Sequence, residues 1–268
     1  MIKLTNVACG YGKRCVLVNV NGEILPGEIM CILGRNGAGK TTLFKTILGL
    51  RMPIKGKVTI NGKSPESYKP RELAQLIGYV PQNTSIPFTL TVFDMVMMGS
   101  FAAHGSNAWG MPGRENRKRA QEALAIAGIE PLSTALFTEI SGGEKRLVII
   151  ARALAQQPLF IAMDEPMAHL DPGNQSRLLQ LLQQLRELGI GVLMNTHDPS
   201  MVLSIANKVM AINEGLICAM GTTAKVLSST LLSSIYETDM QIAEACDNTG
   251  VKHMVCLSRF CSPYERKL

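Results

Sequence analysis

The sequence predicts an α/β protein with a mainly parallel sheet, interrupted by a helical lobe at about residues 88–157. Strand-like and helix-like segments alternate on both sides of this lobe, which is the order that a parallel sheet with crossover helices requires. Ile29–Leu33 is continuously apolar, as expected of a strand that is buried on both faces. From about Thr91 the pattern stays helical until the next apolar strand, and this stretch defines the lobe.

The composition is that of a folded globular chain. Its 268 residues can bury the core of one large domain or of two closely packed lobes. Hydrophobic residues make up 46% and charged residues 18%, a balance that excludes a disordered chain. No apolar run approaches the roughly 18 residues of a bilayer span, and the first residues do not resemble a secretory signal. We therefore expect an intracellular chain without membrane spans.

Cysteine spacing and net charge indicate which cofactors and partners the sequence can be expected to have. Seven cysteines are scattered without a CxxC pair, so neither a disulfide framework nor a zinc site is indicated and reduced thiols are expected. The net charge of +6 is compatible with nucleic acid, an anionic membrane surface or a solvated basic face. The densest basic cluster, Arg114 with Arg117–Arg119, includes Glu115, and only 5% of residues are aromatic and able to stack on bases. We expect no nucleic-acid partner.

The elements of the first half follow from apolar runs and from turn and capping residues. Short strands are predicted at Ile2–Val7, Glu28–Leu33 and Lys57–Ile60, the last before an Asn61-Gly62 turn, with a helical run at Thr42–Leu48. The lobe is predicted to hold helices at Val92–Met98, opened by a Thr91–Asp94 capping box and ended by Gly99, at about Glu115–Ala127, ended by Gly128, and from Ser141 to before Pro158.

Strands return in the second half. They are predicted at Leu159–Met163 and Gly191–Thr196, with a helix at about Pro172–Leu188 between them and Gly189 after it. Lys208–Asn213 and Leu216–Met220 form an expected hairpin through Glu214-Gly215. The pattern beyond Thr222 predicts no element, and residues 226–268 are expected to be a tail that packs on or extends the domain.

A phosphate-binding loop follows the apolar strand that ends at Leu33. The sequence fits GxxxxGK[ST] at every fixed position, between a strand and a helix as this motif requires. Its glycines let main-chain N–H groups surround a phosphate, and the helix that follows adds its positive dipole end. Lys40 can reach the β- and γ-phosphates, and the Thr41 hydroxyl can ligate Mg²⁺. The expected nucleoside triphosphate site consists of Gly34, Arg35, Asn36, Gly37, Ala38, Gly39, Lys40, Thr41 and Thr42.

Two acids follow the apolar strand Leu159–Met163. Asp164 and Glu165 come at its carboxyl end, where ligands gather in open α/β sheets. We interpret Asp164 as a Mg²⁺ ligand and Glu165 as the base that accepts the proton of the attacking water. An acid pair could also simply begin a turn before Pro166, but the phosphate loop favours the functional interpretation.

Across about residues 1–225 the sequence resembles the ATPase subunits of ATP-binding cassette (ABC) transporters. The resemblance rests on several motifs in the family's order besides the phosphate loop and the acid pair. These are Cys9-Gly10-Tyr11-Gly12, Gly78-Tyr79-Val80-Pro81-Gln82, Ile140-Ser141-Gly142-Gly143-Glu144, Leu170-Asp171 and Asn195-Thr196-His197-Asp198.

The resemblance implies a P-loop NTPase core with an N-terminal antiparallel β subdomain and the inserted α-helical subdomain. It also implies that Tyr11 stacks on adenine, that Gln82 joins the Mg²⁺ shell and senses the γ-phosphate, and that His197 is the switch histidine. The signature loop would bind the nucleotide of the opposite protomer through Ser141, Gly142 and Gly143, with Asp171 at the dimer contact. Because the chain has a single phosphate loop, the resemblance implies a homodimer or a heterodimer with a paralogue.

Four positions depart from the common family pattern, and the replacement of the usual leucine by Ile140 is a modest one. Glu144 replaces the usual glutamine, and Ser141-x-x-Glu144 also fits a capping box, which we prefer as its explanation. Met167 replaces a threonine after Asp-Glu-Pro and removes a hydroxyl near Glu165. Asn195 before Thr196-His197 is a milder variant.

Three segments, Arg71–Ala74, Ile77–Gln82 and Phe88–Gly99, together resemble the metal-chelate importer group. The resemblance implies an ATPase on the cytoplasmic face of the inner membrane, bound to permease subunits and served by a substrate-binding protein. Its cargo would be a ferric siderophore, haem, cobalamin or a related metal or oxyanion. Transport would be driven by hydrolysis of ATP, with Mg²⁺ as the cofactor. Alternatives are a zinc or manganese importer, a soluble ABC ATPase of translation or DNA repair, and a regulatory cassette that binds ATP without turnover.

Overall fold

The computed structural model describes residues 1–12, 14–82, 89–105, 111–247 and 250–258. Its centre is a sheet in which five strands run parallel and the last is antiparallel. In spatial order these are β5 (Ile77–Val80), β6 (Phe160–Asp164), β7 (Gly191–Thr196), β3 (Ile29–Leu33), β8 (Lys208–Asn213) and β9 (Leu216–Thr222). The predicted α/β class with a mainly parallel sheet is confirmed, and the hairpin turns at Glu214-Gly215 as expected, both at positive φ.

An antiparallel sheet forms the N-terminal part, as the family resemblance implies. It consists of β2 (Arg14–Ile24), β1 (Ile2–Tyr11) and β4 (Lys55–Ile60), in that order. The sequence pattern predicts a β1 that is too short, Ile2–Val7, and does not predict β2. Bulges interrupt the alternation of buried and exposed residues in this pair and hide the strand pattern. Asn6 and Asn19 adopt positive φ angles of 47° and 53° at these interruptions.

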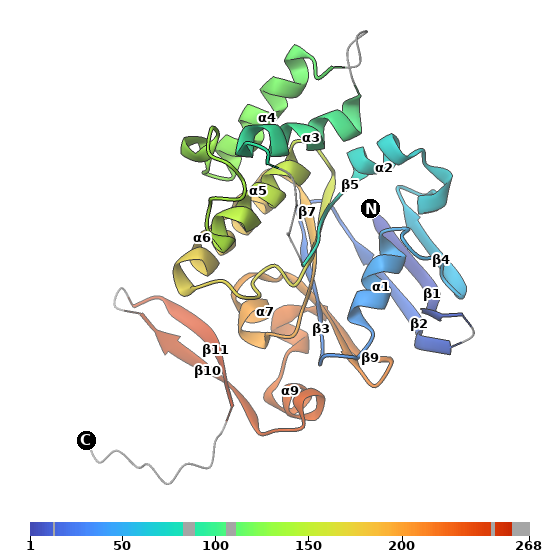
Figure 1. Ribbon diagram of the computed structural model, residues 1–268. Helices are drawn as coiled ribbons and strands as arrows, with labels where there is room; N and C mark the ends of the chain where they lie inside the picture. The colour runs from blue at the N-terminus through green and yellow to red at the C-terminus, as the bar shows by residue number, and fades with distance from the viewer. Residues whose placement is uncertain (13, 83–88, 106–110, 248–249, 259–268) are drawn as a thin grey trace.

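The central sheet is covered on both faces. Ile29, Cys31 and Leu33 belong to a core cluster that includes residues of the lobe and of α6 (Pro172–Glu187) and α7 (Pro199–Ile205). Met30 and Ile32 belong to a second cluster, with α1 (Lys40–Ile47) and the antiparallel sheet. Figure 1 shows α1 and α6 on opposite sides of the central sheet. The two-sided burial expected for Ile29–Leu33 is thus confirmed.

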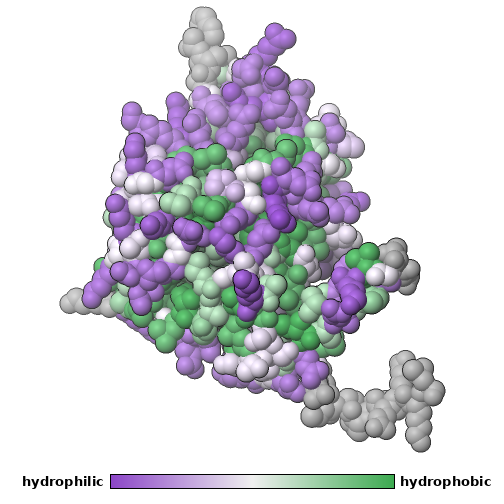
Figure 2. All heavy atoms as spheres, turned by 180° about the vertical axis from the view of Figure 1, so that it is seen from behind, coloured by the Kyte–Doolittle hydropathy of each residue, from purple (hydrophilic) through white to green (hydrophobic). Residues whose placement is uncertain are grey.

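Three helices form the inserted lobe within the residues that the structure describes. They are α3 (Val92–His104), α4 (Arg114–Ile126) and α5 (Gly142–Leu154), with the 3-10 turn η2 (Glu130–Leu132) before α5. Residue 88, where the lobe was expected to begin, lies outside the described residues. Gly128 follows α4 at a φ of 66°, which confirms it as the stop residue. Arg114, Arg117 and Lys118 of α4 are exposed, and Figure 2 shows a hydrophilic surface at this end of the molecule.

Gly99 does not end its helix, and this prediction was wrong. Helix α3 continues to His104, and Gly105 follows at a φ of 80°. A Cβ atom on Gly99 would lie 1.9 Å from the main-chain oxygen of Arg152 in α5. The glycine is therefore required where α3 crosses α5 at short range, and this packing outweighs its low helix propensity.

The chain beyond Thr222 forms elements that the sequence pattern does not predict. We call α8 (Thr223–Val226), α9 (Ser229–Tyr236), β10 (Met240–Cys246) and β11 (Lys252–Ser258) the C-terminal segment. Leu232 and Ile235 of α9 are fully buried. The β10–β11 hairpin extends from the body, with β11 against α7 (Figure 1). Two short elements, η1 (Pro65–Ser67) and α2 (Pro70–Leu76), complete the fold between β4 and β5.

The described cysteines are all free thiols, in agreement with the absence of a CxxC pair. Cys31 and Cys9 are fully buried, and burial raises the pKa of Cys31 to about 12 and that of Cys9 to about 11. Cys261 lies outside the described residues. Among the helices of the described part, none is long and apolar enough to cross a membrane.

We predict that Gly99→Ala lowers the free energy of unfolding by about 2–3 kcal/mol, because the added methyl group would overlap the Arg152 carbonyl. Gly142→Ala is the matched control, since a Cβ atom at that helical position meets no other atom within 4 Å. Chemical denaturation measures both variants. Equal stability of Gly99→Ala and the parent would contradict the close crossing of α3 and α5.

Candidate functional site

Three loops meet at the carboxyl edge of the central sheet. The phosphate loop follows β3, Glu165 follows β6 and His197 follows β7. Parallel pairing sets these strand ends level, because Asp164 pairs with Asn195, and Leu33 pairs with Thr196. Residues that are far apart in the sequence therefore converge at one edge, as is usual for ligand sites in α/β sheets.

The glycines of the phosphate loop permit its tight path. Gly37 and Gly39 adopt φ angles of 85° and 99°, which L side chains rarely tolerate. A Cβ atom on Gly34 would lie 2.5 Å from the main-chain oxygen of Ile212 in β8. Gly39 is also the N-cap of α1, so the positive end of that helix begins inside the loop.

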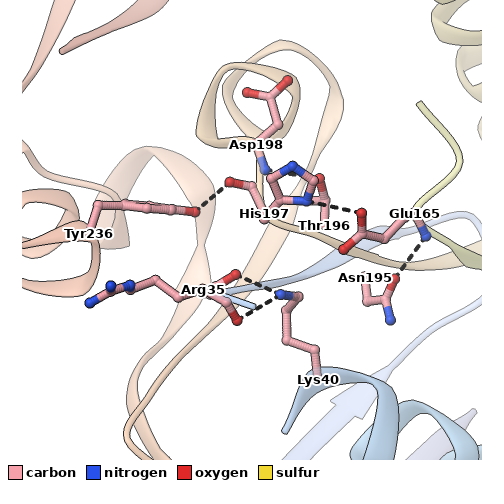
Figure 3. A network of polar contacts seen from close by, with 9 residues as sticks. Arg35, Lys40, Glu165, Asn195, Thr196, His197, Asp198 and Tyr236 are labelled. Carbon is pink, nitrogen blue, oxygen red and sulfur yellow. Dashed lines mark hydrogen bonds and ion pairs between the residues drawn. The ribbon is translucent and has the colours of Figure 1, made fainter. Parts of the chain in front are cut away.

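Lys40 lies within this loop with only 4% of its surface exposed. Its Nζ atom donates hydrogen bonds to the main-chain oxygens of Gly34 and Arg35, at 2.7 and 2.9 Å (Figure 3). Burial lowers the pKa of Lys40, and the nearby carboxylates of Glu165 and Asp164 oppose that shift. A buried ammonium group among main-chain carbonyls and N–H groups is suited to an anionic ligand.

A cavity of about 410 Å³ opens over the loop, and we call it the phosphate-loop cavity. Its lining combines the loop with the aromatic residue and the acid that the sequence singled out. These residues are Tyr11, Arg14, Val16, Asn36, Gly37, Gly39, Lys40, Thr41, Thr42 and Glu165. The structure thus brings together most of the residues predicted for a nucleotide site.

The ring of Tyr11 is held from one side. The guanidinium carbon of Arg51 lies 4.0 Å from the ring centroid, and its Nη1 donates to the Gly10 carbonyl at 3.0 Å. The Thr42 hydroxyl lies 3.4 Å from the Tyr11 hydroxyl. Because a cation covers one face of the ring, a base could stack only on the other face. Sequence reasoning missed Arg51, which follows α1 and belongs to no motif.

Glu165 has an unusual main-chain conformation. Its φ angle is 44°, and its N–H donates to the Oδ1 atom of Asn195 at 2.9 Å and to the main-chain oxygen of Asn195 at 3.2 Å. Asn195 is fully buried at the end of β7. The sequence treated Asn195 as a mild variant, but its side chain secures the turn that presents Glu165. A polar residue ending an apolar strand was the available signal.

His197 lies between Glu165 and the C-terminal segment (Figure 3). Its Nδ1 atom is 3.0 Å from Oε2 of Glu165. This contact is an ion pair whenever the imidazole ring is protonated. On the other side, the Tyr236 hydroxyl donates to the main-chain oxygen of His197 at 2.7 Å. Tyr236 belongs to no motif, and sequence reasoning missed it.

The residues predicted for Mg²⁺ offer oxygen donors. Thr41 lines the phosphate-loop cavity, and Asp164 is 7% exposed at the end of β6, where its charge acts on Lys40. The main chain at Gln82 is fixed by Arg146 of α5, whose guanidinium donates to the oxygens of Pro81 and Gln82 at 2.7 and 2.8 Å. Hydroxyl, carboxylate and amide oxygens fit Mg²⁺, which takes few protein ligands beside phosphates. Within the described residues, no cluster of three or more His, Cys, Asp or Glu suits a metal ion.

The signature residues lie elsewhere, at the first turns of α5 and α6. Ser141 caps α5, and Glu144 completes the expected capping box, with hydrogen bonds of 2.8 and 3.3 Å. Asp171 caps α6 through the N–H of Asn174, and a Cβ atom on Gly143 would meet the Asn174 side chain at 2.3 Å. Ser141, Gly142, Gly143 and Asp171 are absent from the described lining of the phosphate-loop cavity.

Comparison of the sequence with protein families matches residues 17–168 to the family described as ABC transporter. The hemin import ATP-binding protein HmuV of Gloeobacter violaceus is 34% identical, over 85% of this chain and 84% of that protein. The zinc import ATP-binding protein ZnuC of Halorhodospira halophila is 35% identical, over 85% of this chain and 79% of that protein.

Solved structures agree with the family match. An inward-facing ABC transporter described as metal-chelate type superimposes with a TM-score of 0.85 at 31% identity, covering 97% of this chain and 98% of that one. A dimeric bacterial ABC transporter cassette superimposes with a TM-score of 0.71 at 32% identity, covering 83% of this chain and 99% of that one.

We predict that Glu144→Ala lowers the free energy of unfolding by about 1 kcal/mol at neutral pH, because it removes half of the capping box. Hydrogen bonds from the Ser141 side chain and main chain hold the pKa of Glu144 below its usual value. The stabilisation is therefore complete above the unfolded pKa of about 4.3 and is lost as the pH falls through the lower folded pKa.

Chemical denaturation at a series of pH values measures this difference. Glu187→Ala at the exposed last residue of α6 is the control, for which a change within about 0.5 kcal/mol is expected. A Glu144→Ala effect that stays constant down to about pH 3 would show that ionisation of this carboxyl does not contribute.

Proposed function

Because this chain belongs to the ABC transporter family of ATPases, we propose that it is the ATP-hydrolysing subunit of an importer for a metal chelate. In this proposal it lies on the cytoplasmic face of the inner membrane and drives separate permease subunits, which a substrate-binding protein supplies. The cargo would be a ferric siderophore, haem, cobalamin or a related metal or oxyanion. The observation that carries the ATPase part is the convergence of Lys40, Glu165 and His197 at one sheet edge.

ATP would bind in the phosphate-loop cavity. The Lys40 ammonium group would donate hydrogen bonds to its β- and γ-phosphates. In the structure this group donates to the carbonyls of Gly34 and Arg35. The N-terminus of α1 would add main-chain N–H groups and its dipole. Adenine would stack on the face of Tyr11 that Arg51 does not cover. The exposed side chain of Asn36 lines the phosphate-loop cavity and would contact the nucleotide from its rim, and Arg35 would contribute through the main chain of the loop.

Hydrolysis would use Glu165 as the base. A water molecule attacks the γ-phosphorus, its proton passes to Glu165, and the bond to the β–γ bridging oxygen breaks to release ADP. Asn195 holds the Glu165 main chain, and His197 contacts its carboxylate, so the base is oriented before the substrate arrives. His197 would also sense the γ-phosphate as the switch residue.

Mg²⁺ would be held by Thr41, Asp164 and Gln82. When bound, the ion supplies positive charge to the β- and γ-phosphates. The Arg146 guanidinium donates a hydrogen bond to the main-chain oxygen of Gln82. Because Arg146 belongs to α5, which begins at Ser141, this bond connects the loop after β5 to that helix. This connection links the proposed metal ligand to the signature helix.

A second copy would complete each site. Ser141 and Gly142 are exposed, and a Cβ atom on Gly142 would meet nothing within 4 Å within the chain. The open first turn of α5 offers a hydroxyl, main-chain donors and a helix dipole to an anion. We infer that these residues, with Gly143 and Asp171, bind the nucleotide of a partner protomer, in a homodimer or a heterodimer with a paralogue. The dimeric cassette among the solved structures supports this arrangement.

The metal-chelate cargo is supported by two similarities. The metal-chelate type transporter aligns over 97% of this chain, which includes the C-terminal segment. The hemin import relative aligns over 85%. The zinc import relative makes Zn²⁺ the principal rival cargo.

Met167 would affect the rate of ATP hydrolysis, because it lines a cavity beside Glu165 and packs on the core at a position where the family commonly has a hydroxyl.

We predict that Lys40→Ala weakens ATP binding at least about tenfold, because a charge-assisted contact is lost. Lys45→Ala, at the end of the same helix, is the matched control and should bind ATP like the parent. Equilibrium binding of a fluorescent ATP analogue measures both variants. Unchanged affinity in Lys40→Ala would refute the assignment of the phosphate site.

We predict that Glu165→Gln lowers ATP hydrolysis at least about 100-fold, because the general base is lost, while ATP binding is retained. With ATP the variant should accumulate as a dimer, which size-exclusion chromatography with light scattering detects. The parent's specific activity should fall on dilution below the dimerisation constant. Parental turnover in Glu165→Gln, or full activity of dilute monomers, would contradict the mechanism.

We predict that this chain and the permease that co-purifies with it, reconstituted in liposomes with ATP inside and the substrate-binding protein outside, accumulate a metal chelate such as haem or a ferric siderophore. When Zn²⁺ is offered without a chelator, these liposomes should take up no more of it than liposomes that carry the Lys40→Ala variant, which serve as the inactive baseline. Uptake is measured with radioactive metal. Accumulation of free Zn²⁺ without chelate would support the zinc importer instead, and co-purification of ribosomes or DNA rather than a permease would reject transport.

A further inference from the structure

The end of helix α9 lies against the nucleotide site. The Ser228 hydroxyl caps the helix, and Leu232 and Ile235 anchor it in the core. The Ser233 hydroxyl ties it to β10, accepting the N–H of Met240 at 2.9 Å. These contacts give the last residue of the helix, Tyr236, a defined position.

Tyr236 is joined by one short hydrogen bond to His197, in the loop that follows β7. Its hydroxyl donates to the main-chain oxygen of His197 at 2.7 Å, close to the optimum for an O–H···O bond. Burial, reinforced by the negative charge of Asp198, raises the pKa of Tyr236, so the hydroxyl keeps its proton. Tyr236 also lines a cavity of about 480 Å³ with Glu165, Met167, His197 and Met240.

His197 is held from two sides. Its ring contacts Glu165, and its main chain contacts Tyr236 (Figure 3). The side chain of His197 is 51% exposed, so packing alone does not determine where the ring lies. A fixed carbonyl restricts the main chain that carries the ring, and thereby restricts the distance from Nδ1 to the Glu165 carboxylate.

The next residue, Glu237, contacts the phosphate loop. Glu237 ends α9 at a φ of 53°, and its carboxylate forms an ion pair with Arg35 of the phosphate loop. Both side chains are well exposed, so this pair contributes little stability by itself. It does show that two consecutive residues of the C-terminal segment contact two different loops of the site.

We propose that Tyr236 is a positioning residue for the ATPase, which sets His197 against Glu165 through its hydrogen bond to the His197 carbonyl. The C-terminal segment is then part of the switch. Any displacement of His197 during the cycle must either break this bond or carry α9 with it. The inference rests on the proposed role of His197 in hydrolysis.

The test is Tyr236→Phe in the full-length chain, which removes only the hydroxyl. The kcat for ATP should fall about three- to tenfold, as expected for the loss of one hydrogen bond, while KM stays within about twofold. Tyr68→Phe is the matched control, because the Tyr68 hydroxyl donates to the Ile60 carbonyl at 2.5 Å in another part of the chain. Its kcat should equal that of the parent.

A third variant separates this inference from the proposed function. In a His197→Ala background, Tyr236→Phe should cause no further loss of kcat, because both act through the same group. Parental kcat in Tyr236→Phe, or an equal fall in Tyr68→Phe, would overturn the positioning role while leaving the function of the site intact. Full activity in His197→Ala would instead overturn the role of His197 itself, and the present inference with it.

Discussion

The register between parallel strands is the constraint on which the site depends. Asp164 is level with Asn195, and Leu33 is level with Thr196, so the loops after β6, β7 and β3 begin at the same height. Each strand is buried on both faces, and a slip of one residue would exchange the faces of every side chain. The hydrophobic core thus determines, with little freedom, where Lys40, Glu165 and His197 emerge.

Main-chain strain occurs in the turn where the chemistry is proposed, as it does at other described positions such as Asn6 and Gln157. Glu165 and His169 have φ angles of 44° and 63°, a conformation that costs a side-chain-bearing residue on the order of 1 kcal/mol or more. Two acceptors of Asn195 hold the Glu165 N–H and support this conformation. The Nδ2 atom of Asn195 has no partner among the described residues, so this buried amide is retained at an energetic cost. Support of the turn that carries the proposed base Glu165 accounts for that cost.

The lobe and the C-terminal segment share one core with the central sheet. Met95 of α3, Leu232 of α9 and Met163 of β6 belong to the same hydrophobic cluster. Polar connections supplement this packing, since Arg146 reaches Gln82 and Tyr236 reaches His197. These packed side chains and hydrogen bonds are the contacts through which a displacement of the lobe or of α9 would reach the loops of the site.

The sequence by itself determined the features whose causes lie within a few neighbouring residues. The phosphate loop, the Ser141–Glu144 capping box, the stop at Gly128 and the apolar strands follow from local spacing, and all have the predicted structure. Only the tertiary structure decided which distant residues meet. Gly99 serves a helix crossing, and Tyr236 contacts a residue 39 positions away. Such contacts follow from packing over the whole chain, which leaves no periodic or short-range pattern in the sequence.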